Sequence, residues 1–289
     1  MIEILDPGLL STIQDSGRIG FRNLGVPISG FMDSEAARMA NLIVGNPENS
    51  ALIEITLHGP KLRFHGVTQM AITGANLSPE IDHSAIPMNQ LITVNDNSVL
   101  SFGKPVDGVR SYLAIKGGIL SDNVLNSQSQ FRHITYKHKL ERGDMIDIGV
   151  ASTSEIFKMR LEYSYKKNSD VLEAYPGPEF ESLDKNHINT LLASKFQIGL
   201  NDRMGYQLES SITNSVDPII SSAVLPGTVQ LTPSGKLLVL MRDCQTTGGY
   251  PRVLQLSESA INNLSQKRQN ESVRFRLITS DLNAFSGNN

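Results

Sequence analysis

The segment 14–33 is rich in glycine and small polar residues and leads into a predicted helix that begins at Ser34. Glycine lets a loop expose its N–H groups, and a helix N-terminus carries partial positive charge, so both features favour an anion. We expect Arg18, Ser29 and Asp33 to contact substrate here, with Arg18 as a bidentate partner of a carboxylate or phosphate. The alternative is a turn-rich connection with a surface arginine.

A second segment places an acid, a guanidinium and a phenol around one glycine. Asp202, Arg203 and Tyr206 are close together in the sequence. An Asp–Arg pair with a phenol nearby can orient a planar polar substrate. We predict that Arg203 binds an anion and that Asp202 either holds Arg203 or acts as a base. A structural salt bridge at a turn is the alternative.

The third segment, 242–251, follows a predicted buried strand and has several polar residues before a Gly-Gly turn at 248–249. Loops at strand ends are where rigid folds display functional side chains. We expect Gln245, Thr246 and Tyr250 to orient an amide or carboxylate through hydrogen bonds. Cys244 is interpreted as a small packing residue, because no sequence feature names a base that would activate its thiol. A hairpin turn without a binding role is the alternative.

Motifs of several other chemistries are missing from the sequence. The histidines form no His-x-His or His-x-x-x-His pair, and a single cysteine cannot supply a Cys-x-x-Cys site, so no metal centre is predicted. There is no Gly-x-Ser-x-Gly motif for a serine nucleophile and no Gly-Lys-Ser/Thr ending of a phosphate-binding loop. A biotin-attachment motif of the Met-Lys-Met type is also missing, so we expect no biotin on this chain.

The composition is that of an ordinary globular protein. Of 289 residues, 39% are apolar and 19% are charged, and the net charge is −3. The lack of a basic cluster argues against nucleic-acid binding, and no apolar run is long enough to span a bilayer. The first residues lack the pattern of a signal peptide, and a lone thiol fits a reducing compartment. We therefore predict a soluble, cytoplasmic protein of one or two domains.

Short apolar runs between Gly, Pro, Asn and Asp dominate the chain and predict the strands of a barrel or sandwich. Residues 272–278 alternate between polar and apolar, as a half-buried strand does. Helices are predicted over 34–44, about 187–196 and about 257–268, the first of them capped by Asp33 or Ser34. The inner face of the third helix is predicted to be Ala260, Ile261, Leu264 and Ser265.

A polar, lysine-rich stretch over 161–171 separates two halves. We therefore place an N-terminal β subdomain at 1–160 and a C-terminal β subdomain at 161–289. Residues 18–21 and 203–206 share the order arginine, apolar residue, glycine, aromatic residue. This echo is either a coincidence or the trace of two related β units that meet at a pseudo-twofold cleft.

Longer motifs extend these segments in a fixed order along nearly the whole chain. They are Gln14-Asp15-x-Gly17-Arg18, Gly25-Val26-Pro27-x-Ser29-Gly30, Ala51–Glu54, Tyr112–Gly118, Asp202–Tyr206, Pro226–Gln230 and Gln245–Pro251. In these motifs the chain resembles the allophanate hydrolase subunit 2 family, also called the C component of 5-oxoprolinase and the antagonist of a sporulation-kinase inhibitor. The family also forms part of the biotin-dependent carboxyltransferase region of urea carboxylase.

The resemblance implies β-barrel subdomains, at least one of them cyclophilin-like. It also implies a partner of the related subunit 1 family, which is sometimes fused in the same chain. In the bacterial 5-oxoprolinase a lactam-utilisation-type subunit joins the pair, and the assembly opens 5-oxoproline to glutamate with ATP. ATP is therefore the expected cofactor, bound by this chain or by another member of the complex.

The sequence departs from the family pattern in two places. A Ser-x-Ser-Thr and glycine-rich stretch is usual after the central motif, but 126–144 keeps only its closing Gly143-Asp144 clearly. Near the end, Ala260 replaces an acid and Gln269-Asn270 replaces Pro-Gly.

Three functions remain open on the sequence. The first is a subunit of an ATP-dependent 5-oxoprolinase-type amidohydrolase, inactive alone. The second is a carboxyltransferase component that passes a carboxyl group from a partner's carboxybiotin to urea or another amide. The third is a non-enzymatic regulator that binds the subunit 1 homologue.

Overall fold

The structure, a computed structural model, describes residues 1–150, 169–209, 212, 214 and 216–278. The chain forms two compact units: unit 1 is Met1–Asn168 with Ser265–Arg268, and unit 2 is Ser169–Leu264 with Gln269–Asn289. The predicted boundary between 160 and 161 lies outside the described residues and stays a prediction. In the part of the chain that is described, no helix is long and apolar enough to cross a membrane.

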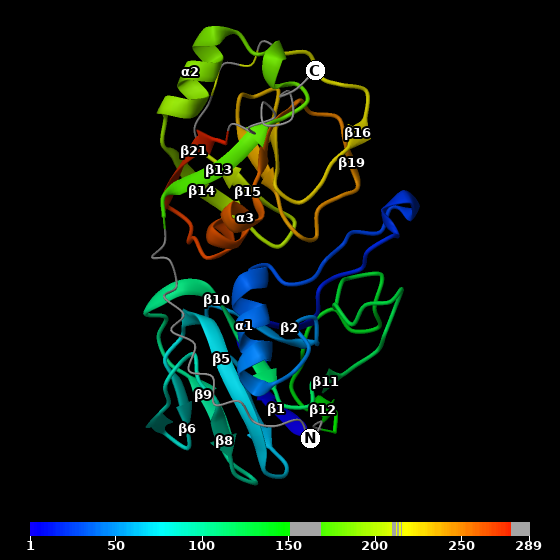
Figure 1. The fold of residues 1–289 in the computed structure, drawn as a ribbon, viewed down its shortest axis with the longest axis vertical. Helices are drawn as coiled ribbons and strands as arrows, with labels where there is room; N and C mark the ends of the chain where they lie inside the picture. Colours follow the sequence, from blue (N-terminus) through cyan, green and yellow to red (C-terminus); the bar gives the residue numbers. More distant parts are fainter. Residues whose placement is uncertain (151–168, 210–211, 213, 215, 279–289) are drawn as a thin grey trace, which may run out of the picture. The chain divides into compact units, whose positions relative to one another are not determined.

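Unit 1 contains two antiparallel sheets (Figure 1). The strands of the larger sheet are β11 (Ile119–Leu120), β12 (Met145–Ile148), β1 (Ile2–Asp6), β4 (Lys61–Phe64), β9 (Val99–Phe102), β6 (Pro79–Ile81) and β7 (Ser84–Ala85), in that spatial order. The strands of the smaller sheet are β2 (Leu10–Gln14), β3 (Leu52–Thr56), β10 (Asp107–Ile115), β5 (Thr68–Asn76) and β8 (Ile92–Val94).

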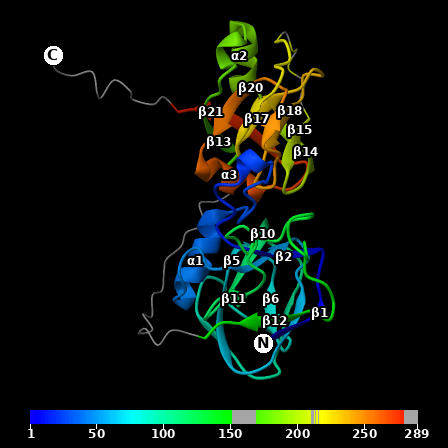
Figure 2. The same ribbon diagram turned by 90° about the vertical axis from the view of Figure 1, so that its right-hand side faces the viewer.

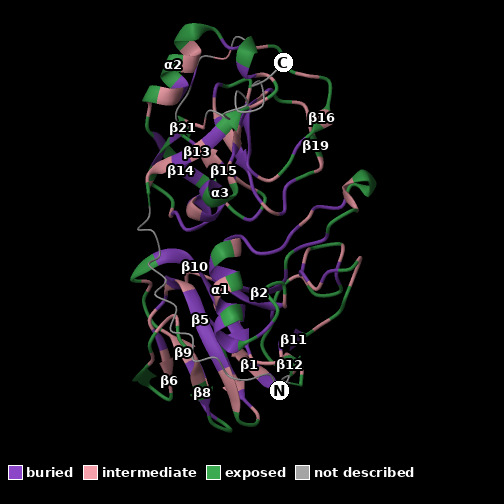
Figure 3. Cartoon of the chain, viewed as in Figure 1, coloured by how far each residue is buried: buried purple, intermediate pink, exposed green. Residues whose placement is uncertain are grey.

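The two sheets of unit 1 pack face to face around one apolar core. Side chains alternate between the faces of a strand, so Ile2 and Ile4 of β1 and Leu113 and Ile115 of β10 all point into this core. The other face of the smaller sheet is also covered, because the helix α1 (Ser34–Val44) packs on it through Ala36, Ala37 and Ala40. β10 is consequently buried along most of its length (Figure 3).

α1 has the bounds that the sequence predicts. Asp33 caps it, since its side chain accepts a hydrogen bond from Ala36 N at 3.1 Å, and Gly45 ends it in the left-handed conformation. A short 3-10 turn, η1 (Arg22–Leu24), lies in the connection before the helix.

Unit 2 is a closed seven-stranded barrel (Figure 2). Its strands, in order around the barrel, are β13 (Val171–Pro176), β20 (Arg252–Leu256), β17 (Thr228–Leu231), β18 (Leu237–Leu240), β15 (Gly205–Leu208), β14 (Phe196–Asn201) and β21 (Ser272–Leu277). Only the β13–β21 pair is parallel among these strands. A ribbon of β16 (Ser222–Ala223) and β19 (Thr247–Gly248), the 3-10 turn η2 (Phe180–Ser182) and two helices complete the described part of the unit.

The two helices of unit 2 differ from their predicted bounds. α2 covers Lys185–Ala193 and not 187–196, because Ser194 is extended and Phe196 already begins β14 with its ring buried. α3 covers Glu258–Ser265 and ends three residues before the predicted limit. Its predicted inner face is confirmed, since Ala260, Ile261, Leu264 and Ser265 are all buried. The alternation predicted for 272–278 is confirmed in β21, which ends at Leu277.

The prediction of a mainly β protein with a few short helices is confirmed. Of the two barrels that the resemblance implies, unit 2 is a closed barrel, whereas the described strands of unit 1 form two sheets packed face to face. The fold class can be predicted because its signal lies in short stretches of sequence. Short apolar runs separated by turn residues bury enough surface only as strands of a closed or layered sheet.

Candidate functional site

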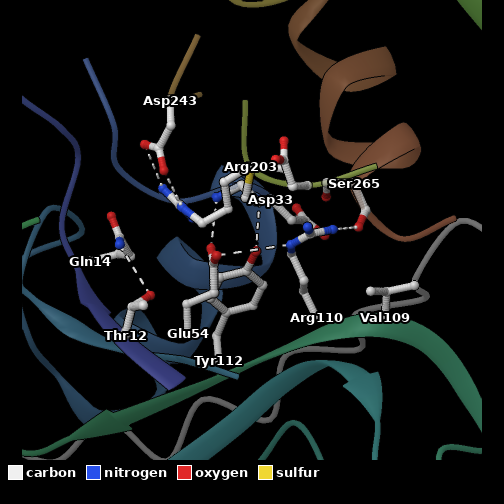
Figure 4. A network of polar contacts seen from close by, with 12 residues as sticks. Thr12, Gln14, Asp33, Glu54, Val109, Arg110, Tyr112, Arg203, Asp243 and Ser265 are labelled. Atoms are coloured by element: carbon white, nitrogen blue, oxygen red, sulfur yellow. Dashed lines mark hydrogen bonds and ion pairs between the residues drawn. The ribbon is translucent and has the colours of Figure 1, made fainter. Parts of the chain in front are cut away.

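The face of β3 and β10 beneath α1 collects buried polar side chains. Glu54 and Tyr112 lie opposite each other in the register of these strands. Glu54 Oε2 accepts a hydrogen bond from Met32 N at 2.8 Å, and Tyr112 Oη accepts one from Asp33 N at 2.7 Å. The two side chains therefore fix the backbone that leads into α1 (Figure 4).

Gln266 belongs to the segment Ser265–Arg268 of unit 1, and its amide bonds directly to β10. Its Oε1 accepts hydrogen bonds from Val109 N (3.0 Å) and Arg110 N (2.9 Å). Its Nε2 donates to Arg110 O and to Asp33 Oδ2, both at 2.9 Å. Gly108 leaves room for this amide, because a Cβ there would lie 2.9 Å from Gln266 Oε1. The amide thus pairs with the strand as a further strand residue would.

Two titratable groups of this cluster have perturbed pKa values. Burial raises the pKa of Asp33 to about 6, and the hydrogen bonds from Gln266 and Ala36 offset only part of that rise. Burial also raises the pKa of Tyr112 well above its usual value, helped by the carboxylates of Glu54 and Asp33. Asp33 can therefore change its protonation state close to neutral pH, whereas Tyr112 stays a neutral hydrogen-bonding group.

Asp15 holds the segment 127–129, which follows the motif Tyr112–Gly118, through several hydrogen bonds. Its Oδ1 accepts hydrogen bonds from the hydroxyl groups of Ser127 (2.7 Å) and Ser129 (2.6 Å), and its Oδ2 accepts one from Gln128 N (2.6 Å). Gly17 N donates to Oδ1 as well, at 2.8 Å. Ser127 and Ser129 thereby hold this segment against Asp15.

Arg18 is completely buried beside this segment. Its Nε donates to Val124 O at 2.9 Å, and its Nη2 donates to Ser129 O at 2.5 Å. Through these hydrogen bonds the guanidinium group holds the main chain at Val124 and Ser129 in place. An additional contact with a substrate anion stays a prediction.

Ser29 adopts a conformation that is uncommon for a residue with a side chain. Its φ is 57°, and its buried hydroxyl has no hydrogen-bond partner among the described residues. The next residue, Gly30, has a φ of 87° and lies against Gly17, whose N would be 3.0 Å from a Cβ at Gly30. The turn is therefore closely packed, and substrate binding by Ser29 stays a prediction.

In unit 2, Arg203 and Asp243 form a buried bidentate ion pair. The distances are 2.7 Å from Nε to Oδ2 and 3.2 Å from Nη2 to Oδ1 (Figure 4). Asp243 N also donates to Arg203 O at 2.9 Å, and Met241 N donates to Met204 O at the same distance. The second and third segments singled out in the sequence are therefore joined at one end of the barrel.

A cavity of about 450 Å³ opens beside this junction. Asp202 and Gln245 line it together with Asn201 and Gln207, so amide and carboxylate groups face a shared space. The apolar part of the lining is Leu200, Met204, Leu238 and Leu240. Asp202 Oδ1 accepts hydrogen bonds from Met204 N (2.7 Å) and Gly205 N (3.0 Å), which hold the carboxylate in place.

The other predicted residues of unit 2 lie outside the lining of that cavity. Tyr206 is fully buried in β15, and Tyr250 is exposed after β19. Thr246 lies next to β19, and its carbonyl accepts a hydrogen bond from Val224 N at 3.1 Å. Cys244 is buried against Val224 and Leu240, which agrees with a packing role. The roles predicted for Tyr206, Thr246 and Tyr250 remain predictions.

No group of three or more His, Cys, Asp or Glu side chains that could hold a metal ion occurs within the described ranges. The polar groups at the two sites belong instead to hydrogen-bond networks and ion pairs.

No binding or catalytic role is predicted from the sequence for Asp15, Glu54, Tyr112, Asp243 or Gln266, although the first four lie within the motifs and segments singled out there. For Glu54 and Tyr112 a signal exists, because a charged residue and a tyrosine inside apolar strand runs indicate a buried polar partner. Gln266 gives no such signal, since a glutamine after a helix is ordinary in sequence.

Comparison with known proteins identifies relatives over almost the full chain. Residues 24–277 match the family described as carboxyltransferase domain, subdomain A and B. The C component of the 5-oxoprolinase of Escherichia coli is 32% identical over 282 residues, which is 95% of this chain and 90% of that protein. The urea amidolyase of Saccharomyces cerevisiae is 45% identical over 131 residues, which is 45% of this chain and 7% of that protein.

Solved structures show the same fold. The Kluyveromyces lactis urea carboxylase matches 96% of this chain with a TM-score of 0.88 at 26% identity. The crystal structure of TTHA0988 matches 95% of this chain with a TM-score of 0.87 at 27% identity. This chain spans 27% of the first of these chains and 55% of the second, so each relative carries further regions.

These matches confirm the family resemblance that the sequence motifs indicate. The matched structures also share the fold described above. The chain belongs to the carboxyltransferase domain, subdomain A and B, family.

Proposed function

We propose that this chain is a subunit of a cytoplasmic, ATP-dependent 5-oxoprolinase-type amidohydrolase, which opens 5-oxoproline to glutamate. The observation that carries this proposal is the similarity to the C component of 5-oxoprolinase, which extends over 95% of this chain and 90% of the relative. A match that covers both proteins nearly end to end favours a shared role in a complex more than a shared domain alone does.

The cavity at the barrel end is the proposed site for the amide substrate. 5-Oxoproline offers one lactam N–H, one C=O, the methylene groups of its ring and one carboxylate, and small-molecule sites combine apolar walls with a few polar groups that fix orientation. The single carboxylate has to be received by neutral amide donors, because the lining contains no Lys or Arg. Gln245 and Asn201 supply amide donors and acceptors, and the leucines of the lining suit the ring. Arg203, held by Asp243, supports the loop that carries Asp202.

Asp202 is the proposed base. Its Oδ1 is engaged by two backbone N–H groups, which leaves Oδ2 to accept a proton from the attacking water. The oxygen of the water then bonds to the amide carbon, the C–N bond breaks, and the leaving nitrogen takes up the proton that Asp202 received from the water. Gln245 N–H groups would stabilise the charge that develops on the amide oxygen.

ATP does not fit this cavity. The lining contains neutral amides and one carboxylate and includes no Lys or Arg, whereas a triphosphate needs cations or a cradle of N–H groups. We therefore propose that ATP binds outside this cavity, on this chain or on another member of the complex. The proposed partners are a subunit 1 homologue and a lactam-utilisation-type subunit.

A carboxyltransferase role is the second candidate, and the 45% identity to urea amidolyase over 131 residues favours it. In that case the same cavity would hold urea or another amide, and a biotin-carrying partner would deliver the carboxyl group.

The test is reconstitution of the three-protein mixture with 5-oxoproline and ATP, with each component omitted in turn. The proposal expects glutamate release that disappears when this chain is left out. Activity that persists without the chain contradicts the proposal. A stable complex that is inactive on 5-oxoproline but carboxylates an amide from carboxybiotin favours the second candidate, and a stable complex without any turnover favours a regulatory role.

A further inference from the structure

Unit 1 contains a cavity of about 180 Å³ that the proposed reaction does not use. More than half of its lining comes from 128–144, the part of the chain that departs from the usual glycine-rich pattern. The side chains of this stretch supply most of the lining, so the cavity belongs to the part of the chain that departs from that pattern.

Part of the lining of this cavity is apolar. Ile13, Leu140 and Ile146 are buried there, and Leu120 is exposed at its edge. The wall is held by hydrogen bonds, because Gln130 Oε1 accepts one from Ile13 N at 3.0 Å. Asp15 fixes Gln128 N at 2.6 Å as well. The cavity is therefore formed before any ligand arrives.

The charges along the rim are not balanced. Lys137 and Asp144 pair with each other, which leaves Asp122 as a second carboxylate. Asp122 has no hydrogen bond or ion pair with any described residue. Next to it, the Ser121 hydroxyl oxygen is buried, lines the cavity and has no hydrogen-bond partner within the described part of the chain. A buried hydroxyl without a partner is costly, so a bound group that supplies one is favoured.

We propose that this cavity binds a small organic ammonium ion, with the ammonium group on Asp122 and Ser121 and a short apolar body against Leu120, Leu140 and Ile146. An ammonium offers three donors, which matches one carboxylate and one hydroxyl acceptor. The ring of Tyr136, which also lines the cavity, attracts cations through its face.

Size limits the ligand to a few heavy atoms. A protein cavity of about 150 Å³ holds benzene, so a cavity of this volume suits an alkylamine or a short-chain α-amino acid. In the amino acid, the carboxylate would reach Lys137 at the rim. An alkylamine and an α-amino acid both carry the ammonium group. Only the amino acid has a carboxylate that would contact Lys137.

The experiment titrates the full chain with n-butylamine, L-norvaline and pentanoate and follows binding by ligand-observed NMR. We expect the amine, the amino acid or both to bind and pentanoate, which lacks the ammonium, not to bind. Asp122→Asn should weaken binding by about tenfold or more, since a charged hydrogen bond is lost. Ser121→Ala should weaken it less.

Glu48→Gln is the matched control, because Glu48 is an exposed acid of the same unit away from this cavity, and its variant should bind as the wild type does. Tighter binding of norvaline than of butylamine, lost in Lys137→Met, identifies an amino acid as the ligand, and equal binding identifies an amine. Binding of pentanoate alone, no binding of either ammonium compound, or an unchanged affinity in Asp122→Asn overturns the proposal. Unfolding midpoints of the variants exclude loss of fold as the cause.

Discussion

Asp33 combines two tasks that conflict at neutral pH. It caps α1 and accepts a hydrogen bond from Gln266, and both contacts favour a carboxylate. Complete burial opposes the charge and prevails, so the pKa rises from 3.8 to about 6. The sequence indicates the cap, because an aspartate precedes a helical pattern. It does not indicate the burial, which depends on Gln266 at a distance of more than 200 residues in the chain.

The first prediction concerns the pH dependence of stability. Because the folded pKa of Asp33 lies above the unfolded one, its contribution to stability is fully present below the unfolded pKa near 3.8 and is lost as pH rises through about 6. The rise corresponds to about 3 kcal/mol of unfolding free energy. Asp33→Asn keeps the cap without the charge, so it should remove this component of the pH dependence.

Urea unfolding at pH values below and above this window measures the effect as a difference between wild type and variant. Asp217→Asn, an exposed acid, serves as the control and should keep the wild-type dependence. If the unfolding free energy depends on pH in the same way in wild type and in Asp33→Asn, Asp33 is not the titrating group.

Asp15 gives the second prediction. Four donors converge on its carboxylate, from Ser127, Ser129, Gln128 and Gly17. In Asp15→Asn one acceptor becomes an NH₂ group that faces donors, so we expect a loss of about 2–4 kcal/mol in unfolding free energy. Asp147→Asn, an exposed acid of β12, should change it by less than about 0.5 kcal/mol. Equal stability of the two variants in chemical denaturation would contradict this role of Asp15.

At the scale of elements, the sequence predicts that a helix or strand is present better than it predicts the residues at which that element begins and ends. α1 is predicted correctly because both of its ends have local signals, Asp33 and Gly45. α3 ends at Ser265, three residues before the predicted limit, and the side-chain amide of the next residue, Gln266, hydrogen-bonds to the main chain of β10. Such a contact joins residues 156 positions apart and leaves no pattern in a single sequence.

The third prediction tests that contact. Gln266→Ala leaves the N–H groups of Val109 and Arg110 without their acceptor in a buried setting, so the unfolding free energy should fall by about 2–4 kcal/mol. Gln197→Ala, an exposed glutamine on β14, should be nearly neutral. Amide hydrogen exchange should also speed up at β10 in Gln266→Ala alone. Unchanged protection of β10 would argue against a strand-like role of the Gln266 amide.

At the scale of the whole molecule, the fold class can be predicted from the sequence. The assignment of residues to the two units cannot. Short runs and turn residues predict a mainly β chain, and the motif order predicts the family. The inclusion of Ser265–Arg268 in unit 1 could not be predicted, because the signal for a domain is local composition, and this segment begins with the last residue of α3, a helix that otherwise belongs to unit 2. Of the predicted site residues, Asp202 and Gln245 line one cavity and Arg203 pairs with Asp243, while the binding and catalytic roles of these residues stay predictions.

The fourth prediction also belongs to the whole molecule, since the proposed activity needs the assembled complex. Asp202→Asn should lower kcat by about 10²-fold or more as a lost general base, whereas Gln245→Ala should mainly raise KM. Asp217→Asn again serves as the control, because Asp217 is an exposed acid of unit 2 outside the cavity lining.

The decisive measurement is glutamate release by the reconstituted complex that contains wild type, Asp202→Asn or Asp217→Asn. We predict wild-type turnover with Asp217→Asn and strongly reduced turnover with Asp202→Asn, while all three chains assemble equally well. Equal turnover with all three would contradict the placement of the amide substrate in the barrel cavity.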